Sequence, residues 1–436
     1  MNNPEITIEN LAVGGKGVGR VAGQACFVPF SAPGDRMTIR ITNKKRNYLE
    51  GEMLELLEPS PWRTVPLCPA FGSCGGCNWQ HLDYSYQCQT KRNLLADLLR
   101  RIARFSEPLV EDTVAAPSAF GYRARAQFKL FATPEKLLAG FYKNGSRYVV
   151  DLPDGCPIVT LDINMVMQRL RNVLEASPER HLIPQLSIEE GTEGVVAIVH
   201  YIGQEHKQLK AFLLKHREQL QLHGLWLQSR RKDSLEPVFG SNTLSYNVPA
   251  WLEDRQLLDL KYDIGSFSQV NRSQNRVLIR LVHGLLEPHQ AGRLLDVYCG
   301  NGNLSLPLAG LVSGIVGVEE YPPSIASAID NVNGISVNSC TFRCCSASAE
   351  VERLLAEKEQ FDYILIDPPR SGAADIAGRL ALFNARRIVY VSCDPATFAR
   401  DAATIVKTGY QLSRAIPLDM FPHTAHLETV ALFVKP

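Results

Sequence analysis

Residues 293–310, RLLDVYCGNGNLSLPLAG, decide the fold class of this 436-residue chain. An apolar run is followed by a glycine turn, Gly300-Asn-Gly302, and then by the start of a helix. The next apolar run, GIVGVEE (314–320), ends in the acid Glu319. Glycines at a strand-to-helix turn let the backbone approach a ligand closely, and an acid ending the second strand can accept hydrogen bonds from ribose hydroxyls. This order predicts a nucleotide-like ligand on a parallel α/β sheet.

The region around this motif continues the same pattern of strands that end in polar residues. FDYILIDPP contains Asp367, RIVYVSCDP contains Cys393, and Asp296 precedes the glycine turn. Parallel strands present their carboxyl ends to one crevice, so we expect these side chains to lie close together. The third glycine of a dinucleotide fingerprint is missing. Residues 263–436 therefore look like an α/β, Rossmann-like S-adenosylmethionine methyltransferase domain, in which Cys393 faces the methyl donor.

A cysteine at this place suggests covalent chemistry, although a free cysteine is more often an apolar filler. Amine-methylating enzymes carry an aromatic residue where DPPRSG has Arg370, so an amino nitrogen is a poor acceptor here. An unreactive carbon such as uracil C5 needs a thiolate to add at C6 and a base to remove the C5 proton. MFPHTAHLET offers His423, His426 and Glu428, and we predict Glu428 as the base.

These motifs together resemble the RNA 5-methyluridine methyltransferases, and within them the TRAM-containing bacterial 23S ribosomal RNA uracil-C5 methyltransferases. The stretches that carry the resemblance are FSQVN (267–271), DVYCGNGN, DPPRSG, VSCDPATFARD and MFPHTAHLET. It implies that Cys393 is the nucleophile and Glu428 the base. It further implies contacts to S-adenosyl-L-methionine from Gln269, Tyr298, Asn303, Glu319 and Asp367, with another near Ser346.

One position departs from the family, because Asp394 stands where an Asn is usual. A carboxylate beside the nucleophile is expected to disfavour the thiolate, so the reactivity of Cys393 would rest on other neighbours.

A cysteine-rich loop, CPAFGSCGGCNWQH, predicts a metal or iron–sulfur site. Cys68, Cys74 and Cys77 are spaced C-x5-C-x2-C, and the fourth ligand is either Cys88 or Cys156. Cys88 falls within a helical pattern, whereas Cys156 lies in a turn that can fold back. Spacing alone leaves zinc and iron–sulfur open. The resemblance implies a [4Fe-4S] cluster that is completed by Cys156 and has a structural role.

The remaining chain predicts two parts before the methyltransferase domain. Residues 1–58 alternate short apolar runs with glycine turns, which favours a small β-barrel that resembles a TRAM (OB-like) RNA-binding domain. Residues 59–262 form an α+β central iron–sulfur domain, whose helix at about 84–104 is placed to pack on the catalytic domain. Residues 160–260 are the least informative.

The stretch FGYRARAQFKLF (120–131) has two possible meanings. In a strand, alternate residues share a face, which would group Arg123, Arg125 and Gln127. Interleaved with Tyr122, Phe128 and Phe131, they fit single-stranded RNA, whose bases stack on aromatic rings. An ordinary amphipathic strand explains the pattern equally well.

The composition limits which partners and which cellular compartment we expect. The net charge is +1, so any RNA-binding surface must be local. Eleven cysteines, several of them crowded, argue against a secreted disulfide framework. The polar start and the interrupted apolar runs predict no signal peptide and no membrane span. We expect a cytoplasmic protein, acting as a monomer on 23S ribosomal RNA.

Three other functions remain open from the sequence. The same chemistry could modify the T-loop of transfer RNA. A non-catalytic iron–sulfur RNA-binding factor would need none of Cys393, Glu428 and the donor-loop residues. N-methylation is disfavoured by Arg370 and leaves Cys393 unexplained.

Overall fold

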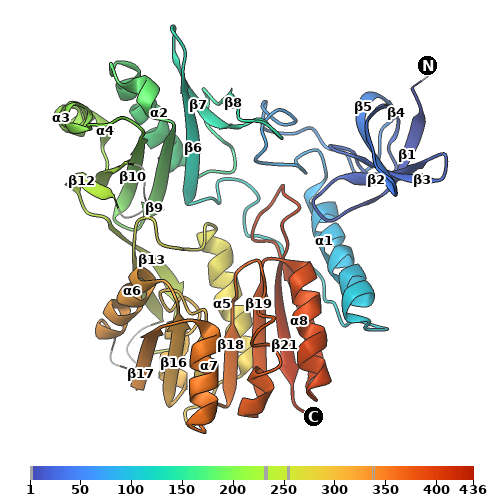
Figure 1. Ribbon diagram of the computed structural model, residues 1–436, viewed down its shortest axis with the longest axis vertical. Coiled ribbons are helices and arrows are strands. Elements are labelled where there is room, and N and C mark those ends of the chain that lie inside the picture. Colours follow the sequence, from blue (N-terminus) through green and yellow to red (C-terminus); the bar gives the residue numbers. More distant parts are fainter. Residues whose placement is uncertain (1–2, 230–233, 253–255, 336, 338) are drawn as a thin grey trace.

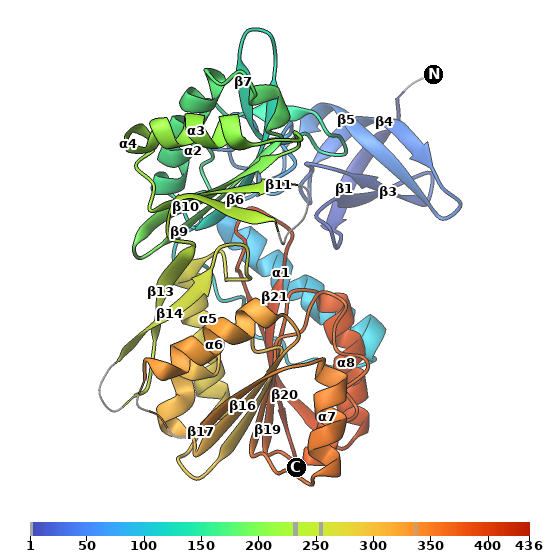
Figure 2. The same cartoon turned by 60° about the vertical axis from the view of Figure 1, so that its left-hand side comes forward.

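The structure is a computed structural model, and it describes residues 3–229, 234–252, 256–335, 337 and 339–436. Two seven-stranded sheets and one closed barrel make up most of the molecule (Figure 1). The barrel lies beside the first sheet, and the second sheet lies below both, as the turned view also shows (Figure 2). Among the described residues, no helix is long and apolar enough to cross a bilayer.

The N-terminal strands close into the expected small barrel, in the order β1-β2-β3-β5-β4. Its strands are β1 (Glu5–Leu11), β2 (Gly17–Val21), β3 (Gln24–Val28), β4 (Arg36–Lys44) and β5 (Tyr48–Glu58). Alternate apolar residues point inward, and Ile8, Val28 and Met37 are among those that fill the interior. Pairing of β1 with β4 leaves the sheet without a free edge.

The central part is a seven-stranded mixed sheet with the order β12-β11-β10-β9-β6-β7-β8. Its strands are β6 (Arg125–Ala132), β7 (Leu137–Tyr142), β8 (Val149–Asp151), β9 (Gln185–Gly191), β10 (Gly194–Tyr201), β11 (Gly224–Ser229) and β12 (Leu235–Gly240). Helices α2 (Leu161–Glu175), α3 (Lys207–Lys215) and α4 (Arg217–Leu220) and a short 3-10 turn, Arg180–Leu182, accompany it. A two-stranded ribbon, β13 (Thr243–Pro249) and β14 (Leu257–Asp263), leads to the second sheet.

Helix α1 (Tyr84–Leu98) belongs to the N-terminal half of the sequence but packs on the C-terminal sheet region. It continues as one π-helical turn, Leu99–Ala103, which ends at Arg104 in the left-handed conformation. Leu95 and Leu99 are buried in the same apolar cluster as strand and helix residues of the C-terminal half. The figures show α1 beside α8 (Pro395–Lys407) in both views.

The C-terminal sheet has the order β17-β16-β15-β18-β19-β21-β20, with only β21 antiparallel to its neighbours. Its strands are β15 (Arg293–Val297), β16 (Gly314–Glu319), β17 (Ser339–Cys344), β18 (Tyr363–Ile366), β19 (Arg387–Ser392), β20 (Gln411–Leu418) and β21 (Glu428–Val434). Helices α5 (Arg272–Leu286), α6 (Pro322–Asn333), α7 (Ala347–Ala356) and α8 cover both faces, with 3-10 turns at Leu306–Leu311 and Leu380–Phe383. This is the doubly wound sheet that the glycine motif predicts.

Candidate active site

The carboxyl ends of three parallel strands and the start of an antiparallel one bring the predicted residues to one edge of the C-terminal sheet. Glu319 ends β16, Asp367 follows β18 directly, and Cys393 follows β19 directly. Glu428 begins β21, which runs the opposite way, so its start lies at the same edge. Residues far apart in the sequence therefore meet because of the strand order, as the pattern predicts.

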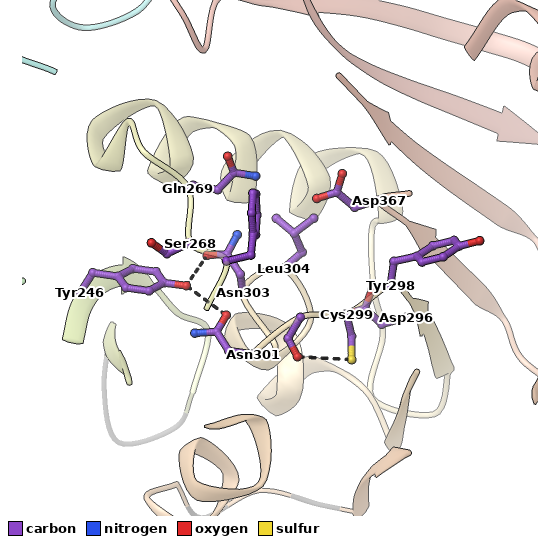
Figure 3. Close-up of a pocket in the computed structure, with 12 residues that line it drawn as sticks. Tyr246, Ser268, Gln269, Asp296, Tyr298, Cys299, Asn301, Asn303, Leu304 and Asp367 are labelled. Atoms are coloured by element: carbon purple, nitrogen blue, oxygen red, sulfur yellow. Dashed lines mark hydrogen bonds between the residues drawn. The ribbon is translucent and has the colours of Figure 1, made fainter. Parts of the chain in front are cut away.

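A pocket opens above the glycine turn that follows β15 (Figure 3). Its lining combines backbone from the turn with side chains from the loop before α5 and from β13. The lining residues are Tyr246, Phe267, Ser268, Gln269, Asp296, Tyr298, Cys299, Gly300, Asn301, Asn303, Leu304 and Asp367. Of the predicted donor contacts, Gln269, Tyr298, Asn303 and Asp367 are in this lining, whereas Glu319 and Ser346 are not.

Both glycines of the turn have a positive φ, a backbone conformation that glycine adopts readily. Gly300 has a φ of +55° and Gly302 a φ of +84°, and a side chain at Gly302 would meet Leu306 at 2.5 Å. Tyr298 also has a positive φ, of +67°, which is uncommon for a bulky residue and typical of functional sites. Glu319 supports the turn from beside it, because its carboxylate accepts from the Gly300 N–H at 3.3 Å and from the Tyr321 N–H at 2.9 Å.

Two acids that line the pocket, Asp296 and Asp367, together with Glu319 beside the turn, make this region rich in hydrogen-bond acceptors. Burial, with the charges of Asp367 and Glu319 added, raises the pKa of Asp296 to about 7. Burial and then the charge of Glu319 raise the pKa of Asp367 to about 7. Within the described part of the chain, Oδ2 of Asp296 is buried with no hydrogen-bond partner. The residues fit S-adenosylmethionine, because its amino group and sulfonium are positively charged and its ribose carries hydroxyl donors.

The far wall of the pocket is an amide network that the sequence did not reveal. Asn303 and Asn275 exchange two hydrogen bonds of 2.9 and 2.8 Å. The Tyr246 hydroxyl lies 3.2 Å from Oδ1 of Asn301 and 3.1 Å from Oδ1 of Asn303, as the dashed lines in Figure 3 show. Tyr246 comes from β13, within the least informative stretch, and nothing in its local pattern marks it as a pocket residue.

Cys393 and Glu428 lie next to the last residue pair of the β19–β21 ladder. Ser392 is paired with Thr429 there, and Cys393 and Glu428 are the neighbouring residues on the two strands. Burial, followed by the charges of Glu428 and Asp367, raises the pKa of the Cys393 thiol to about 11. Burial and the charge of Asp367 hold the pKa of Glu428 well above its usual range. The thiol is therefore protonated at neutral pH in the free protein.

One cation opposes these shifts. The Arg370 side chain is exposed, and its charge lowers the pKa of both Cys393 and Glu428. The loop that carries Arg370 is held by α8, because the Thr397 hydroxyl donates to the Arg370 carbonyl at 3.2 Å. Arg370, the residue that argues against an amine acceptor, therefore also brings a positive charge to the predicted nucleophile Cys393.

Asp394 has a different role from the one that its sequence position suggested. Its Oδ1 accepts from the N–H groups of Ala396 at 3.0 Å and Thr397 at 2.9 Å, so it is the N-cap of α8. The neighbours that raise the pKa of Cys393 are Glu428 and Asp367, which lie across the site. Ser346 has a similar role, because it caps α7 through the Ala349 N–H.

The two histidines before β21 are placed differently. His423 is buried against Phe120, with ring centroids 4.3 Å apart, and burial lowers the pKa of its imidazole to about 4. His426 is exposed. His423 is thus a neutral packing group, whereas Glu428 lies beside Cys393.

The cysteines predicted as ligands line a second cavity, of about 150 Å³, in the central part. Cys68, Cys74, Cys77 and Cys156 all contribute to it, together with Phe71, Gly76, Gln80, Arg123, Phe141, Leu152 and Ile158. Cys88 lies elsewhere, on α1 near Asp419 and Lys91. Among the residues that the structure describes, no three His, Cys, Asp or Glu side chains are close enough to hold a single metal ion.

Only part of the stretch 120–131 is strand, in β6 (Arg125–Ala132), so Arg123 lies outside the strand, and most of the residues follow the amphipathic alternative. Tyr122 and Phe128 are buried in the core of the central part, so they offer no ring to a base. Arg125 forms an ion pair with the buried Glu189 at 3.1 Å and donates to the Ser266 carbonyl at 2.7 Å. Phe131 is 59% exposed, and only this aromatic residue of the three remains available for stacking.

Comparison with known proteins gives one family match for the N-terminal barrel and another for most of the remaining chain. A family described as tRNA (Uracil-5-)-methyltransferase matches residues 83–435, and the TRAM domain matches residues 4–54. The chain is 34% identical to the 23S rRNA (uracil(1939)-C(5))-methyltransferase RlmD of Azoarcus sp. (strain BH72), with 99% of this chain and 100% of the relative covered. It is 31% identical to the RlmD of Vibrio parahaemolyticus serotype O3:K6, with 99% and 95% covered.

A solved structure agrees with this over the whole length. The tRNA (uracil-54, C5)-methyltransferase of Pyrococcus abyssi, in complex with S-adenosyl-L-homocysteine, is 27% identical to the chain, with a TM-score of 0.74. The alignment covers 99% of this chain and 100% of the archaeal one. The chain therefore belongs to the tRNA (Uracil-5-)-methyltransferase family, carries an N-terminal TRAM domain, and is an S-adenosylmethionine-dependent RNA (uracil-C5)-methyltransferase.

Proposed function

We propose that this enzyme transfers a methyl group from S-adenosylmethionine to C5 of one uridine in 23S ribosomal RNA through a covalent adduct on Cys393. The observation that carries the proposal is the Cys393–Glu428 pair, a thiol and a carboxyl at the edge of the sheet where the donor pocket opens. The relatives named for uracil 1939 of 23S RNA, at 31–34% identity over nearly the whole chain, support the choice of RNA.

The reaction follows from the chemistry of uracil. S-adenosylmethionine supplies an electrophilic methyl group from the pocket of Gln269, Tyr298, Asn303 and Asp367. The Cys393 thiolate forms a bond to C6, and the displaced electron pair makes C5 nucleophilic through the O4 enolate. C5 takes the methyl group, which leaves its former sulfur neutral. Glu428 then removes the C5 proton, the ring double bond re-forms, and the Cys393–C6 bond breaks.

The protonation states of Cys393 and Glu428 determine when each residue can react. The raised pKa of Cys393 means that its thiol must release its proton to solvent when C6 is attacked, and Glu428 must itself be ionised before it can act as a base. The positive charge of Arg370 favours loss of the proton from Cys393 and from Glu428. The target uridine must also leave its stack to reach this sheet edge.

We further propose that Cys68, Cys74, Cys77 and Cys156 hold a [4Fe-4S] cluster. Four thiols around a cavity of about 150 Å³ suit a cluster, whereas zinc would require four sulfurs at about 2.3 Å from one point. The methyl transfer described above has no redox step, so the cluster would serve to fold the central part. We expect the enzyme to act as a monomer in the cytoplasm.

Transfer RNA is the alternative substrate. One observation favours it, the match over the whole chain to an archaeal transfer RNA enzyme. The two substrates are distinguished by incubating the purified enzyme and radiolabelled donor with transcripts of 23S RNA and of transfer RNA, followed by mapping of 5-methyluridine. Labelling of a single 23S uridine supports the proposal. Labelling of the T-loop alone moves the substrate to transfer RNA, and no labelling of either would favour a non-catalytic RNA-binding factor.

A further inference from the structure

The segment that leads into Glu428 is held by the N-terminal half of the chain. We call residues 419–427, between β20 and β21, the base loop. Figure 1 shows it in red, rising away from the sheet past α1. The strand pairing of Glu428 with Leu418 fixes where the chain re-enters the sheet. Between these two residues the loop bonds to α1 and to the residues after Cys77, which in turn bond to the barrel, and it also bonds to Tyr122 and Asn271.

The first contact is a buried glutamine on α1. Oε1 of Gln87 accepts from the His423 N–H at 2.9 Å, and its Nε2 lies 3.2 Å from Nδ1 of the same histidine. Gln87 is fully buried and also donates to the carbonyls of Trp79 and Leu82. His423 has a φ of +64°, a left-handed conformation that is unfavourable for a histidine and persists only where surroundings enforce it.

The second contact comes from the residues just after the last cysteine of the cysteine loop. The N–H groups of Asn78 and Trp79 donate to the His423 carbonyl at 3.2 and 3.0 Å. Oδ1 of Asn78 accepts from the Ala425 N–H at 2.9 Å. Asn78 directly follows Cys77 in the chain, so the cysteine loop and the base loop are neighbours in space.

The third contact comes from the barrel. Nδ2 of Asn78 donates to the Gly14 carbonyl at 3.2 Å, and the Trp79 indole donates to the Gly15 carbonyl at 3.0 Å. A Cβ at Gly15 would lie 2.5 Å from Nδ2 of Asn78 and 2.9 Å from Cβ of Ala425. The barrel turn therefore fits closely against both the cysteine loop and the base loop.

We propose that Gln87 and Asn78 are positioning residues for Glu428, acting through the base loop. The backbone N–H and carbonyl of His423, the residue with the left-handed conformation, bond to Gln87, Asn78 and Trp79, and the loop connects directly to a carboxyl whose burial is nearly complete. Displacement of the loop would admit water to Glu428 and misplace its carboxylate against the methylated adduct. This inference rests on the role of Glu428 proposed above.

The effect of a displaced base loop on catalysis can be distinguished from a general loss of stability. A misplaced base slows release of the product and leaves methyl transfer intact, so methylated RNA should accumulate on Cys393. A misplacement of about 1 Å can cost about 100-fold in rate, so we expect release to slow at least about tenfold. Binding of S-adenosylhomocysteine should stay unchanged, because neither residue lines the donor pocket.

The test uses two matched pairs of variants in the full-length protein. Asn78→Ala removes the acceptor for the Ala425 N–H, whereas Asn78→Asp keeps that acceptor and puts a carboxylate oxygen in place of the amide nitrogen that donates to the Gly14 carbonyl. Gln87→Met removes the acceptor for the His423 N–H, together with the donations to the Trp79 and Leu82 carbonyls. Thr90→Val is its control, because Thr90 is buried on the same helix and hydrogen-bonds to Tyr86.

The measurement is the share of radiolabelled methyl in a denaturation-resistant protein–RNA band, with KM for RNA, kcat and donor affinity determined in parallel. We expect an adduct and a lowered kcat for Asn78→Ala and Gln87→Met, at an unchanged donor affinity, and normal release for Asn78→Asp and Thr90→Val. Normal release by Asn78→Ala and Gln87→Met overturns the inference, as does loss of donor binding in proportion to activity. Glu428→Gln is the reference. If it gives no adduct, the base assignment itself is wrong, and the positioning role fails with it.

Discussion

Replacing Lys91 by Met should destabilise the protein strongly, because it leaves a buried carboxylate without its partner. Nζ of Lys91 lies 2.6 Å from Oδ1 of Asp419, and both side chains are 0% exposed. Breaking such a pair by removing one partner typically costs about 3–5 kcal/mol. The lysine also donates to the Phe421 carbonyl at 3.3 Å, so part of the loss should appear as disorder of the base loop.

The magnitude is checked by urea unfolding at neutral pH, with two comparisons. The double variant Lys91→Met/Asp419→Leu removes both charges and should recover most of the lost free energy of unfolding. Arg40→Met breaks a pair with Glu52 at the same 2.6 Å, but the two side chains are 60% and 55% exposed, so little should change. A loss below about 1 kcal/mol for Lys91→Met, or a double variant as unstable as the single one, would refute the reasoning.

The remaining predictions concern the reactive thiol and the cysteine cavity. Because the pKa of Cys393 is raised to about 11, its alkylation by iodoacetamide, followed by peptide mass spectrometry, should rise about tenfold per pH unit between pH 7 and 10. A plateau near pH 8.5 would show an ordinary thiol instead. Anaerobically purified protein should carry a brown iron–sulfur chromophore that is lost in Cys156→Ser and kept in Cys88→Ser, since only Cys156 lines the cavity. Stoichiometric zinc without iron, or the reverse pattern in the two variants, would contradict the ligand set.

The elements that could be predicted from the sequence are those with a local signature. The glycine turn after β15 and the apolar strands that end at Asp367 and Cys393 follow from patterns of a few residues. The role of Asp394 was equally local, because an Asp before Pro at the start of a helix is an N-cap pattern. The charge of Asp394 is directed to the N–H groups of Ala396 and Thr397 at the start of α8.

What could not be predicted depends on contacts between distant parts of the chain. Lys91 and Asp419 are 328 residues apart, and no periodicity marks either as a partner. The burial of Phe128 depends on which face of β6 turns to the core of the central part, and the alternation of the strand fits either orientation. Tyr246 reaches the donor pocket only because the β13–β14 ribbon packs against the glycine turn.

The covalent role of Cys393 is the central claim, and RNA that carries 5-fluorouridine at the target position tests it most directly. Fluorine at C5 cannot be removed as a proton, so the reaction should stop after methyl transfer with the RNA bound to the enzyme. With S-adenosylmethionine present, the wild-type enzyme should give a band on a denaturing gel that contains protein, RNA and labelled methyl, mapped to Cys393 by mass spectrometry. Cys393→Ala should give none. A denaturation-resistant adduct in Cys393→Ala, or one mapped to another cysteine in the wild type, would contradict the mechanism.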